Sequence, residues 1–250
     1  MDKTLIKQRF AKAVATYEKE AAVQRQIASH MVELMEKYLP EDVHSNVWEI
    51  GCGTGMLTRF YLNRFTPEEL YLNDLCPEVK PYLEDVLSSK VTFEAGDAEG
   101  MLPPLQTSLL VSCSALQWLE EPVSFLARCQ DAMTSDAFLA FSMFGEDNMK
   151  EMCMLAENTL KYYTLDELKD MLARQGLNVL YSEEERIPLQ FDSPLDVLRH
   201  LKLTGVTGIN RQQWTKGKLE SFCRQYKDMF ALQDGRVALT YHPVYIIIKK

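Results

Sequence analysis

The sequence predicts an α/β protein whose mostly parallel sheet is covered by helices on both faces. Short apolar segments alternate with amphipathic segments up to about residue 144. A glycine-rich turn directly follows the first apolar segment, and acidic residues stand at the ends of the next two. Parallel strands that are buried on both faces read as nearly continuous apolar runs. The order of these features therefore favours a doubly wound sheet with a ligand site at its strand ends.

The individual elements follow from periodicity and from capping signals. Residues 1–40 carry apolar side chains at an approximately helical period, and Pro40 ends that segment. Strands are expected at 47–50, 69–74, 90–95, 107–114, 136–144, 177–182 and 237–248, and helices at 56–65, 164–176, 193–204 and 215–230. Thr164 and Glu167 have the spacing of a capping box, and Ser193 is placed to cap the next helix. The expected sheet thus has seven strands.

We expect the 250 residues to form a single domain with four parts. These are an N-terminal helical cap (1–40), a ligand-binding core (41–185), a helical lid inserted before the last strand (186–236) and the last strand itself (237–250). No segment approaches the roughly 18 apolar residues of a membrane span. The first ten residues also lack the apolar stretch of a signal peptide. We therefore expect a cytoplasmic protein without a membrane partner.

Cysteine spacing and net charge exclude several classes of function. The six cysteines are scattered without a Cys-x-x-Cys pair, which favours neither a metal site nor disulfides. The net charge of −9 makes nucleic acid an unexpected partner. Residues 186–236 nevertheless contain nine Lys or Arg against five acids. This segment is either a basic face for an anionic partner or an ordinary solvated helix surface.

The spacing of glycines in the glycine-rich turn distinguishes between two kinds of cofactor-binding motif. It reads Glu49-x-Gly51-Cys52-Gly53-x-Gly55. A dinucleotide fingerprint would need a glycine at position 56, which is Met56, so a nicotinamide cofactor is disfavoured. The observed spacing resembles motif I of class I S-adenosylmethionine-dependent methyltransferases, which have a Rossmann-like fold. We expect Glu49, Gly51, Cys52, Gly53 and Gly55 to form the cofactor loop, against the alternative of a simple tight turn.

Two acids at successive strand ends support this interpretation. Asp74 lies 19 residues after Gly55, where a carboxylate can accept both hydroxyls of a ribose. Asp97 follows the third strand, where methyltransferases of this class place an acid near the adenine amino group. Leu75, Ala98 and Ser114, which lie beside these positions or at the end of the fourth strand, are also expected to line the cofactor site. The alternative for each acid is a solvated turn residue.

Several further segments resemble the malonyl-[acyl-carrier protein] O-methyltransferases of the biotin pathway. They are residues 9–13 with 16–18 and 24–25, residues 112–118, residues 198–202 with Gly205, and residues 239–242. The resemblance implies methyl transfer from S-adenosylmethionine to the free carboxylate of a malonyl thioester on acyl carrier protein, or on coenzyme A. Such a carboxylate, with a pKa near ~4, is ionised at neutral pH and needs no general base.

The resemblance also suggests which side chains hold the acceptor. Arg199 is expected to bind the carboxylate, with Lys202 on the same helix face, because Arg makes bidentate contacts with carboxylates. Gln117 and Trp118 follow the fourth strand, where the acceptor usually lies. The alternatives are a solvated charge for Arg199 and a plain wall residue for Trp118.

Two residues of the N-terminal segment complete the expected site. Tyr17 is expected to contact both cofactor and acceptor with its hydroxyl, and Gln24 to reach the methionine end of the cofactor. The alternative for Tyr17 is core packing. The acidic carrier protein would dock on the basic 186–236 segment. Two other functions stay open: a methyltransferase of a small metabolite such as a quinone precursor, and a non-catalytic cofactor-binding regulator.

Overall fold

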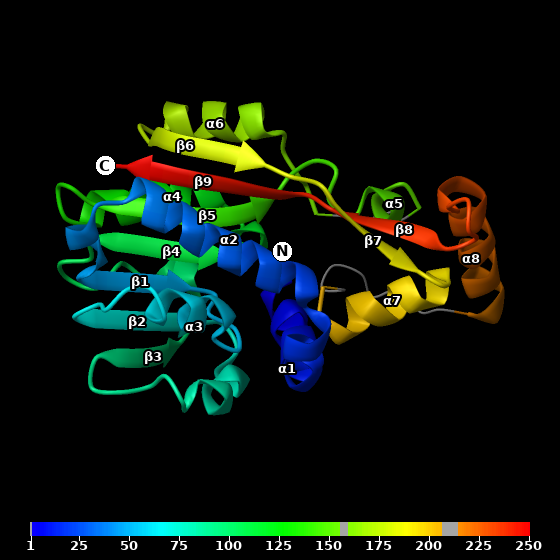
Figure 1. The fold of residues 1–250 in the computed structure, drawn as a ribbon, viewed down its shortest axis with the longest axis horizontal. Helices are drawn as coiled ribbons and strands as arrows, with labels where there is room; N and C mark the ends of the chain where they lie inside the picture. Colours follow the sequence, from blue (N-terminus) through cyan, green and yellow to red (C-terminus); the bar gives the residue numbers. More distant parts are fainter. Residues whose placement is uncertain (1, 156–159, 207–214) are drawn as a thin grey trace.

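A seven-stranded sheet forms the centre of the molecule (Figure 1). The computed structural model describes residues 2–155, 160–206 and 215–250. The strand order is β3-β2-β1-β4-β5-β9-β6, and among the described strands of this sheet β9 runs antiparallel to both of its neighbours. The prediction of a seven-stranded, mostly parallel sheet is therefore confirmed. A separate two-stranded sheet pairs β7 with β8.

The bounds of the elements are as follows. The strands are β1 (Asn46–Ile50), β2 (Glu69–Asp74), β3 (Val91–Ala95), β4 (Leu109–Cys113), β5 (Phe138–Phe144), β6 (Asn178–Glu184), β7 (Ile187–Phe191), β8 (Val237–Tyr241) and β9 (Pro243–Lys249). The α-helices are α1 (Lys3–Glu20), α2 (Ala22–Tyr38), α3 (Met56–Leu62), α4 (Pro122–Ala132), α5 (Lys150–Cys153), α6 (Leu165–Arg174), α7 (Pro194–Leu203) and α8 (Lys216–Phe230). Short 3₁₀ turns are η1 (Glu41–His44), η2 (Pro77–Leu83), η3 (Ala98–Gly100) and η4 (Leu116–Trp118).

Helices cover both faces of the sheet, because neighbouring residues of each buried strand point to opposite sides. Val47 and Leu109 belong to the apolar cluster that includes residues of α2 and α3. Trp48 and Leu110 belong to a second cluster, formed with residues of α4 and α6. Residues 246–248 at the end of β9 are all fully buried, since the strand is covered on both faces. The predicted two-faced burial is thus confirmed.

The N-terminal segment consists of two helices and not of one, as the periodicity suggested. The helical run breaks at Ala21, which has φ −88° and ψ 49° and is fully buried. The break lets α2 pack on the sheet while α1 turns across the ends of the strands (Figure 1). A helical period therefore runs through a point where the chain changes direction.

The expected last strand, 237–248, is also interrupted. His242 separates β8 from β9, and its ring and backbone are held in place from the β5 side. Its Nδ1 accepts the backbone N–H of Asp147 at 3.1 Å, and its carbonyl accepts that of Gly145 at 2.8 Å. A Cβ on Gly145 would lie 2.6 Å from the His242 ring, so only glycine fits there. The kink sends β8 out of the main sheet while β9 stays in it.

The predicted helical lid at 186–236 contains a strand as well as helices. Residues 187–191 form β7, whose partly buried and exposed side chains alternate, a period-2 signal of a strand. We call the unit formed by β7, α7, α8 and β8 the insertion. It packs against α1: the hydroxyl of Thr16 donates to the carbonyl of Leu203 at 2.8 Å, and Gly205 lies against Phe10.

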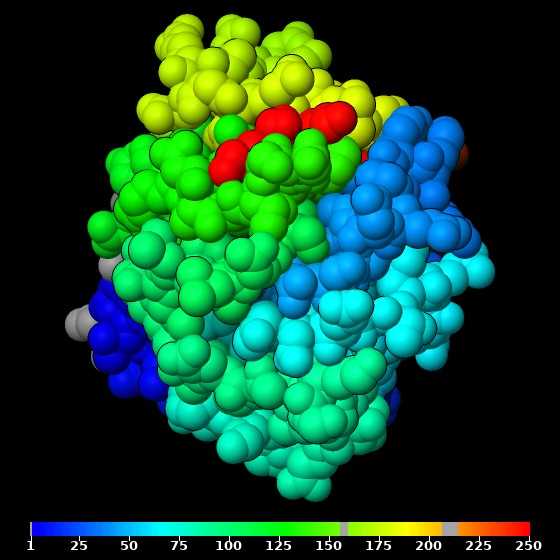
Figure 2. Space-filling model, turned by 90° about the vertical axis from the view of Figure 1, so that its left-hand side faces the viewer, coloured from blue at the N-terminus to red at the C-terminus, as the bar shows by residue number. Residues whose placement is uncertain are grey.

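The two ends of the sheet differ in what they present. The carboxyl ends of the first four strands point towards α1 and the insertion (Figure 1). Figure 2 views the molecule from the left-hand side of Figure 1, and there the C-terminal residues reach the surface between the β6–α6 segment and the β5 segment.

None of the described helices is long and apolar enough to span a bilayer.

Candidate active site

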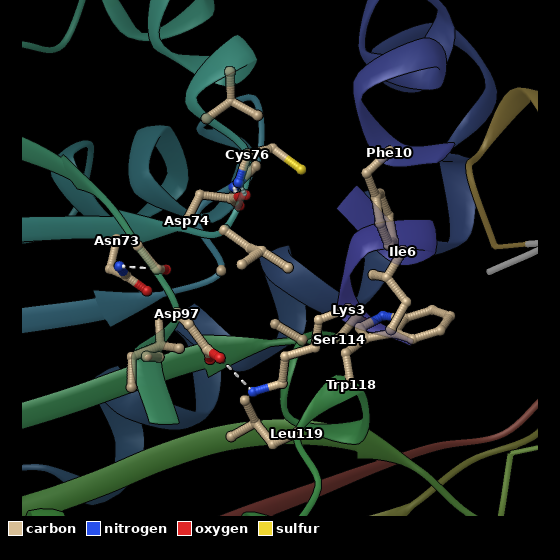
Figure 3. A pocket seen from close by; sticks show the side chains of 18 of the residues that line it. Lys3, Ile6, Phe10, Asn73, Asp74, Cys76, Asp97, Ser114, Trp118 and Leu119 are labelled. Carbon is tan, nitrogen blue, oxygen red and sulfur yellow. Dashed lines mark hydrogen bonds and ion pairs between the residues drawn. The ribbon is translucent and has the colours of Figure 1, made fainter. Parts of the chain in front are cut away.

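A cavity lies between α1 and the carboxyl ends of the first four strands (Figure 3). Its free space is about 920 Å³, open mouth included. One wall is α1, and the opposite wall is made of the turns that follow β1, β2, β3 and β4. In an open α/β sheet a ligand is expected at the carboxyl ends of the strands, at the point where the strand order reverses. Here that point is beside β1, which has β2 on one side and β4 on the other.

The turn after β1 is built from glycines in left-handed conformations. Gly51 has φ +68° and Gly53 has φ +53°, and both line the cavity. A Cβ on Gly51 would lie 2.2 Å from the Cβ of Ala115, so the turn fits closely against the loop after β4. Gly55, with φ +84°, forms the N-cap of α3 and lies outside the cavity lining. The first two glycines bring backbone directly to the cavity surface.

Asp74 ties the glycine turn to the end of β2. Its two carboxylate oxygens accept the backbone N–H groups of Gly53 and Cys76, each at 2.8 Å. Burial raises the pKa of Asp74, and these two hydrogen bonds act against that rise. The carboxylate is therefore fixed in place at the cavity wall, with lone pairs left for a ligand's hydroxyls.

Glu49 lies beneath the glycine turn and not in the cavity lining. Its side chain is 1% exposed and accepts a hydrogen bond from the Thr58 hydroxyl at 2.8 Å. Burial, together with the nearby charge of Asp74, raises the pKa of Glu49 to about 8, although the Thr58 bond works in the opposite direction. Glu49 thus connects β1 to α3 and supports the turn from below.

The loops after β3 and β4 form the remainder of the sheet wall. Asp97 caps η3 by accepting the N–H of Glu99 at 3.1 Å, and Ala98 lines the cavity beside it. Ser114 adopts φ +54°, and its buried hydroxyl has no partner among the described residues. A non-glycine residue in this conformation is costly and is typical of functional sites. Its free hydroxyl offers a hydrogen bond to a ligand.

The wall formed by α1 is apolar except for two side chains. Ile6, Phe10 and Val14 face the cavity, and the ring of Phe10 meets Trp118 edge to face, with centroids 5.5 Å apart. Tyr17 also lines the cavity, and burial raises the pKa of its hydroxyl, so that it stays protonated and can donate a hydrogen bond. The other polar side chain on this wall is Lys3.

The structure brings nine of the predicted site residues together at the cavity. They are Tyr17, Gly51, Gly53, Asp74, Leu75, Asp97, Ala98, Ser114 and Trp118. Seven others lie outside its lining. They are Gln24, Glu49, Cys52, Gly55, Gln117, Arg199 and Lys202. Of these, Cys52 and Gly55 belong to the glycine turn itself, and Gln117 is held by its own loop, donating to the carbonyl of Ser114 at 2.6 Å.

Arg199 and Lys202 depart most from the expectation. Both are exposed, because α7 buries the opposite face through Val197, His200 and Leu201. The helix therefore turns its basic residues towards solvent and its apolar residues towards the protein. Neither side chain belongs to the described cavity lining, so the carboxylate-binding role of Arg199 stays a prediction that this arrangement does not support.

Gln24 lies on α2, close to the insertion. It is 7% exposed and is hydrogen-bonded to the hydroxyl of Tyr241, while its Oε1 has no partner among the described residues. The Tyr241 hydroxyl also lies 2.8 Å from Nε2 of His200 on α7. The expected contact of Gln24 with a cofactor thus stays a prediction, whereas its contact with the insertion is observed.

Sequence reasoning missed much of the α1 wall and part of the sheet wall. Ile6, Phe10 and Val14 carried a signal, since they recur at helical spacing with Tyr17 on one side of the N-terminal segment. That period predicted a helix but not what its face covers. Lys3 and Cys76 carried no signal, because their positions depend on contacts made far along the chain.

The residues present fit an adenosine-type cofactor. The buried hydroxyl of Thr54 in the glycine turn has no partner among the described residues, and neither has that of Ser114. Asp74 offers carboxylate oxygens where a ribose diol is held in folds of this type, and the lining between these groups is largely apolar. The cavity thus combines an apolar body with a few polar groups that fix orientation.

Comparison with known proteins places the chain among methyltransferases. Residues 21–182 match a family model described as "Methyltransferase domain". The malonyl-[acyl-carrier protein] O-methyltransferase of Bacteroides thetaiotaomicron is 46% identical, over 100% of this chain and 99% of that protein. That of Haemophilus influenzae is 37% identical, over 100% and 95%. In the Bacteroides fragilis protein of the same name, which is also 46% identical, the chain spans only half of the relative's length.

Solved structures share the fold at low sequence identity. Phosphoethanolamine N-methyltransferase 2 of Haemonchus contortus, in complex with S-adenosylmethionine, has a TM-score of 0.58 at 14% identity, covering 96% of this chain and 57% of that one. An S-adenosylmethionine-dependent methyltransferase of Mesorhizobium loti has a TM-score of 0.54 at 14% identity, covering 87% and 96%. These similarities concern the fold alone.

Proposed function

The chain belongs to the malonyl-[acyl-carrier protein] O-methyltransferases, a family of S-adenosylmethionine-dependent enzymes, and we propose that it methylates the free carboxylate of a malonyl thioester on acyl carrier protein. The observation that carries this proposal is identity of 46% along the whole length of a relative of that name. The product is the malonyl-carrier-protein methyl ester, whose masked charge would suit it to chain extension towards pimelate and biotin.

Methylation of a carboxylate requires the protein to orient the two reactants, and it requires no proton transfer. The bound cofactor supplies an electrophilic methyl group. A malonyl carboxylate with a pKa near ~4 is already the nucleophile at neutral pH, so no side chain has to remove a proton. The apolar α1 wall excludes water and holds the acceptor, and good alignment is worth roughly 7 to 11 kcal/mol at its best. This fits a cavity with few polar side chains.

The cofactor would lie along the sheet wall. In this proposal the backbone of Gly51 and Gly53 supports its methionine part, Asp74 accepts the ribose hydroxyls, and Asp97 accepts the adenine amino group. Leu75, Ala98 and Ser114 line the same surface. Glu49, Cys52 and Gly55 hold the turn in shape, and Gln24 approaches from α2.

The acceptor would enter between α1 and the loop after β4. We assign the carboxylate contact to the hydroxyl of Tyr17, which is protonated and faces the cavity. A neutral donor orients a carboxylate without withdrawing its nucleophilic electrons as strongly as an ion pair does. Trp118 forms the adjoining wall, and Gln117 fixes the loop that carries it.

The carrier protein would dock on the basic surface of the insertion. Two of the nine basic residues in 186–236 are neutralised locally, since Arg186 pairs with Asp147 and Glu184, and Arg236 pairs with Asp234. Arg211 lies outside the described residues. The exposed cations that remain are Arg199, Lys202, Lys216, Lys218, Arg224 and Lys227, which we call the basic surface. Surface charges of this kind increase the rate at which an acidic partner associates and do not change the affinity for the cofactor.

Mass spectrometry of the carrier protein tests the proposed reaction. Malonyl-carrier protein is incubated with the enzyme and S-adenosylmethionine, beside succinyl- and acetyl-carrier protein and malonyl-coenzyme A. We expect one added methyl group on the malonyl-carrier protein, removed by mild ester hydrolysis. The acetyl species has no free carboxylate and should not change.

The control is the same reaction with a Gly51→Ala enzyme, which should not hold the cofactor. If the wild-type protein binds cofactor but leaves malonyl-carrier protein unmodified, the proposed acceptor is wrong. A methyl group found only on malonyl-coenzyme A would contradict the carrier-protein part of the proposal. A small metabolite such as a quinone precursor would become the acceptor to test if neither malonyl species reacts.

A further inference from the structure

Lys3, in the first turn of α1, crosses the cavity to the opposite wall. Its Nζ lies 2.6 Å from a carboxylate oxygen of Asp97 and also contacts the carboxylate of Glu99. Figure 3 shows the Lys3–Asp97 pair on the side of the cavity where the loop after β3 lies. The ion pair joins residues 94 positions apart in the sequence. It therefore links two walls of the cavity and not neighbouring parts of one element.

Glu99 is a fixed and preorganised partner for this lysine. Its second carboxylate oxygen accepts the backbone N–H groups of Glu120 and Glu121, each at 3.0 Å. Its carbonyl accepts a hydrogen bond from Arg128 at 2.8 Å. Burial raises the pKa of Glu99, but Lys3 and the two N–H groups lower it overall. The two backbone N–H groups and the Arg128 contact thus hold this carboxylate and its backbone in place independently of Lys3.

The ion pairs are partly shielded from water. The side chains of Lys3 and Glu99 are 24% and 17% exposed, whereas that of Asp97 is 42% exposed. Burial lowers the pKa of Lys3, but its hydrogen bonds to Asp97 and Glu99 raise it above the ordinary value. Partly buried, charge-assisted hydrogen bonds are stronger than fully exposed surface pairs. The Lys3–Glu99 pair, which is the less exposed of the two, is therefore expected to contribute more than the Lys3–Asp97 pair.

The rest of α1 is held by other contacts, including the Thr16–Leu203 hydrogen bond near its C-terminal end. Phe10 packs edge to face on Trp118, and the thiol of Cys76 donates to the carbonyl of Lys7 at 3.5 Å. These contacts anchor the middle of the helix. Its first turn, which is capped by Asp2, is joined to the opposite wall through Lys3. A ligand lying between the α1 wall and the sheet wall is enclosed as long as these contacts persist.

We propose that Lys3, Asp97 and Glu99 form a latch that closes α1 over the adenosine end of the cofactor site and limits the rate at which the spent cofactor leaves. Opening this end requires α1 to move away from the loop after β3, and that movement breaks both ion pairs. The latch concerns cofactor retention, so it rests on the family's cofactor and not on the proposed acceptor. Lys3 is a positioning residue in this scheme and takes no part in methyl transfer.

The test is the dissociation rate of S-adenosylhomocysteine, measured by chase with an excess of tritiated S-adenosylmethionine and without any acceptor. We expect Lys3→Ala to release the ligand about 5- to 20-fold faster, because it removes two charge-assisted contacts. Glu99→Gln should raise the rate in the same direction. Lys3→Arg, which preserves the charge, should stay within about 2-fold of the wild type.

Lys12→Ala is the matched control, since Lys12 is an exposed lysine on the same helix. It should leave the rate unchanged. Raising the salt from about 0.05 to 0.5 M should speed release from the wild type and have little effect on Lys3→Ala, because salt screens the ion pairs. Circular dichroism and Tm confirm that each variant is folded.

Equal rates for Lys3→Ala and Lys12→Ala would overturn the latch. So would a salt dependence in Lys3→Ala as steep as that of the wild type. The double variant Lys3→Ala with Glu99→Gln should release the ligand no faster than Lys3→Ala alone, since Lys3→Ala already removes the contact that Glu99→Gln weakens. None of these measurements involves malonyl substrate, so a failed latch leaves the proposed acceptor untouched.

Discussion

The sheet wall of the cavity and the insertion are built in different ways. On the sheet wall, polar groups are locked by backbone contacts: Asp74 accepts two N–H groups, and Gly51 fits against Ala115. In the insertion, the basic residues of α7 and α8 face solvent, and the buried side consists of apolar residues with a few polar anchors. The first arrangement suits a small ligand that is held in one pose. The second suits a large partner that is met at the surface.

The core and the insertion nevertheless each contain a buried histidine bound to a tyrosine. On the core side, Nδ1 of His44 lies 2.6 Å from the hydroxyl of Tyr61, and its ring stacks on Phe65. In the insertion, Nε2 of His200 lies 2.8 Å from the hydroxyl of Tyr241. Burial lowers the pKa of both histidines. A buried His–Tyr contact thus joins two elements in the core and two in the insertion. The core and the insertion differ more in their surfaces than in these buried contacts.

The largest expected effect concerns the glycine turn. Gly51→Ala would place a Cβ 2.2 Å from Ala115 at a backbone position with φ +68°. Both strain and overlap displace the turn from the cavity, so we expect the Kd for S-adenosylmethionine to rise about 1000-fold or binding to be lost. Isothermal titration calorimetry measures this change directly.

Gly53→Ala is the matched variant, because Gly53 also has a positive φ but nothing lies within 4 Å of its added Cβ. It lacks the overlap with protein atoms, so we expect a smaller rise in Kd, roughly tenfold, from backbone strain of about 1 to 2 kcal/mol and from the methyl group added at the cavity surface. If the two variants bind equally poorly, close contact with Ala115 is not what shapes the turn.

The second prediction reverses charges in the insertion. Changing Lys216, Lys218, Arg224 and Lys227 to Glu should raise KM for malonyl-carrier protein about 50-fold, since it replaces attraction by repulsion towards an acidic partner. The Kd for S-adenosylmethionine should stay within about 2-fold, because α8 does not line the cavity. Steady-state kinetics and calorimetry give the two numbers.

Lys80→Glu and Lys90→Glu serve as the control for total charge, since both lysines are exposed on the main domain away from the insertion. They should change KM for the carrier protein little. An equal rise in KM for both sets of variants would mean that net charge, and not the position of the basic surface, determines docking.

The third prediction concerns the buried histidine of the core. Burial lowers the pKa of His44 to about 4, against about 6.5 in an unfolded chain. Between these values the unfolded state takes up a proton that the folded state does not, so stability falls as the pH falls. From pH 7 to pH 5 this contribution is roughly 2 kcal/mol. Urea unfolding at the two pH values should show it in the wild type.

His44→Gln, which does not titrate, should lose that part of the pH dependence. His30 gives the opposite sign: burial lowers its pKa, but hydrogen bonds to Glu183 and Glu33 raise it overall, so its contribution is present at low pH and is lost as the pH rises. An unchanged difference between pH 7 and pH 5 in His44→Gln would refute the assignment to His44.

The smallest expected effect tests the matching anchor in the insertion. Tyr241→Phe removes the hydroxyl that contacts both His200 and Gln24, leaving a buried ring nitrogen without this partner. We expect a loss of about 1 kcal/mol in the free energy of unfolding. Tyr71→Phe on β2, where the residue is only partly buried, should stay within about 0.5 kcal/mol of the wild type. Indistinguishable losses would show that the His200–Tyr241 contact adds no stability.

Local sequence patterns predicted the sheet wall of the cavity. Two other local patterns, the helical period of residues 1–40 and the apolar run of residues 237–248, each predicted one continuous element where the structure has two. The strand, the glycines at 51 and 53 and the acid at 74 are consecutive features of one strand–turn–helix unit and its neighbour, so their spacing carries the information. The breaks at Ala21 and His242 were missed because each interrupts a pattern that continues on the far side. The strand 187–191 did carry a period-2 pattern, but the helices that follow dominated the interpretation of that segment.

By itself, the sequence determined the order of strands and helices and the family, and it predicted a cofactor site at the glycine turn, Asp74 and Asp97, because each of these follows from local patterns of residue type and spacing. Only the tertiary structure decided which side of α7 faces solvent, and therefore that Arg199 lies on the surface. Only the tertiary structure brought Lys3 to Asp97 and Glu99 as well. The physical reason is that burial of apolar side chains orients a helix as a whole, and charged residues far apart in the chain meet wherever that orientation places them.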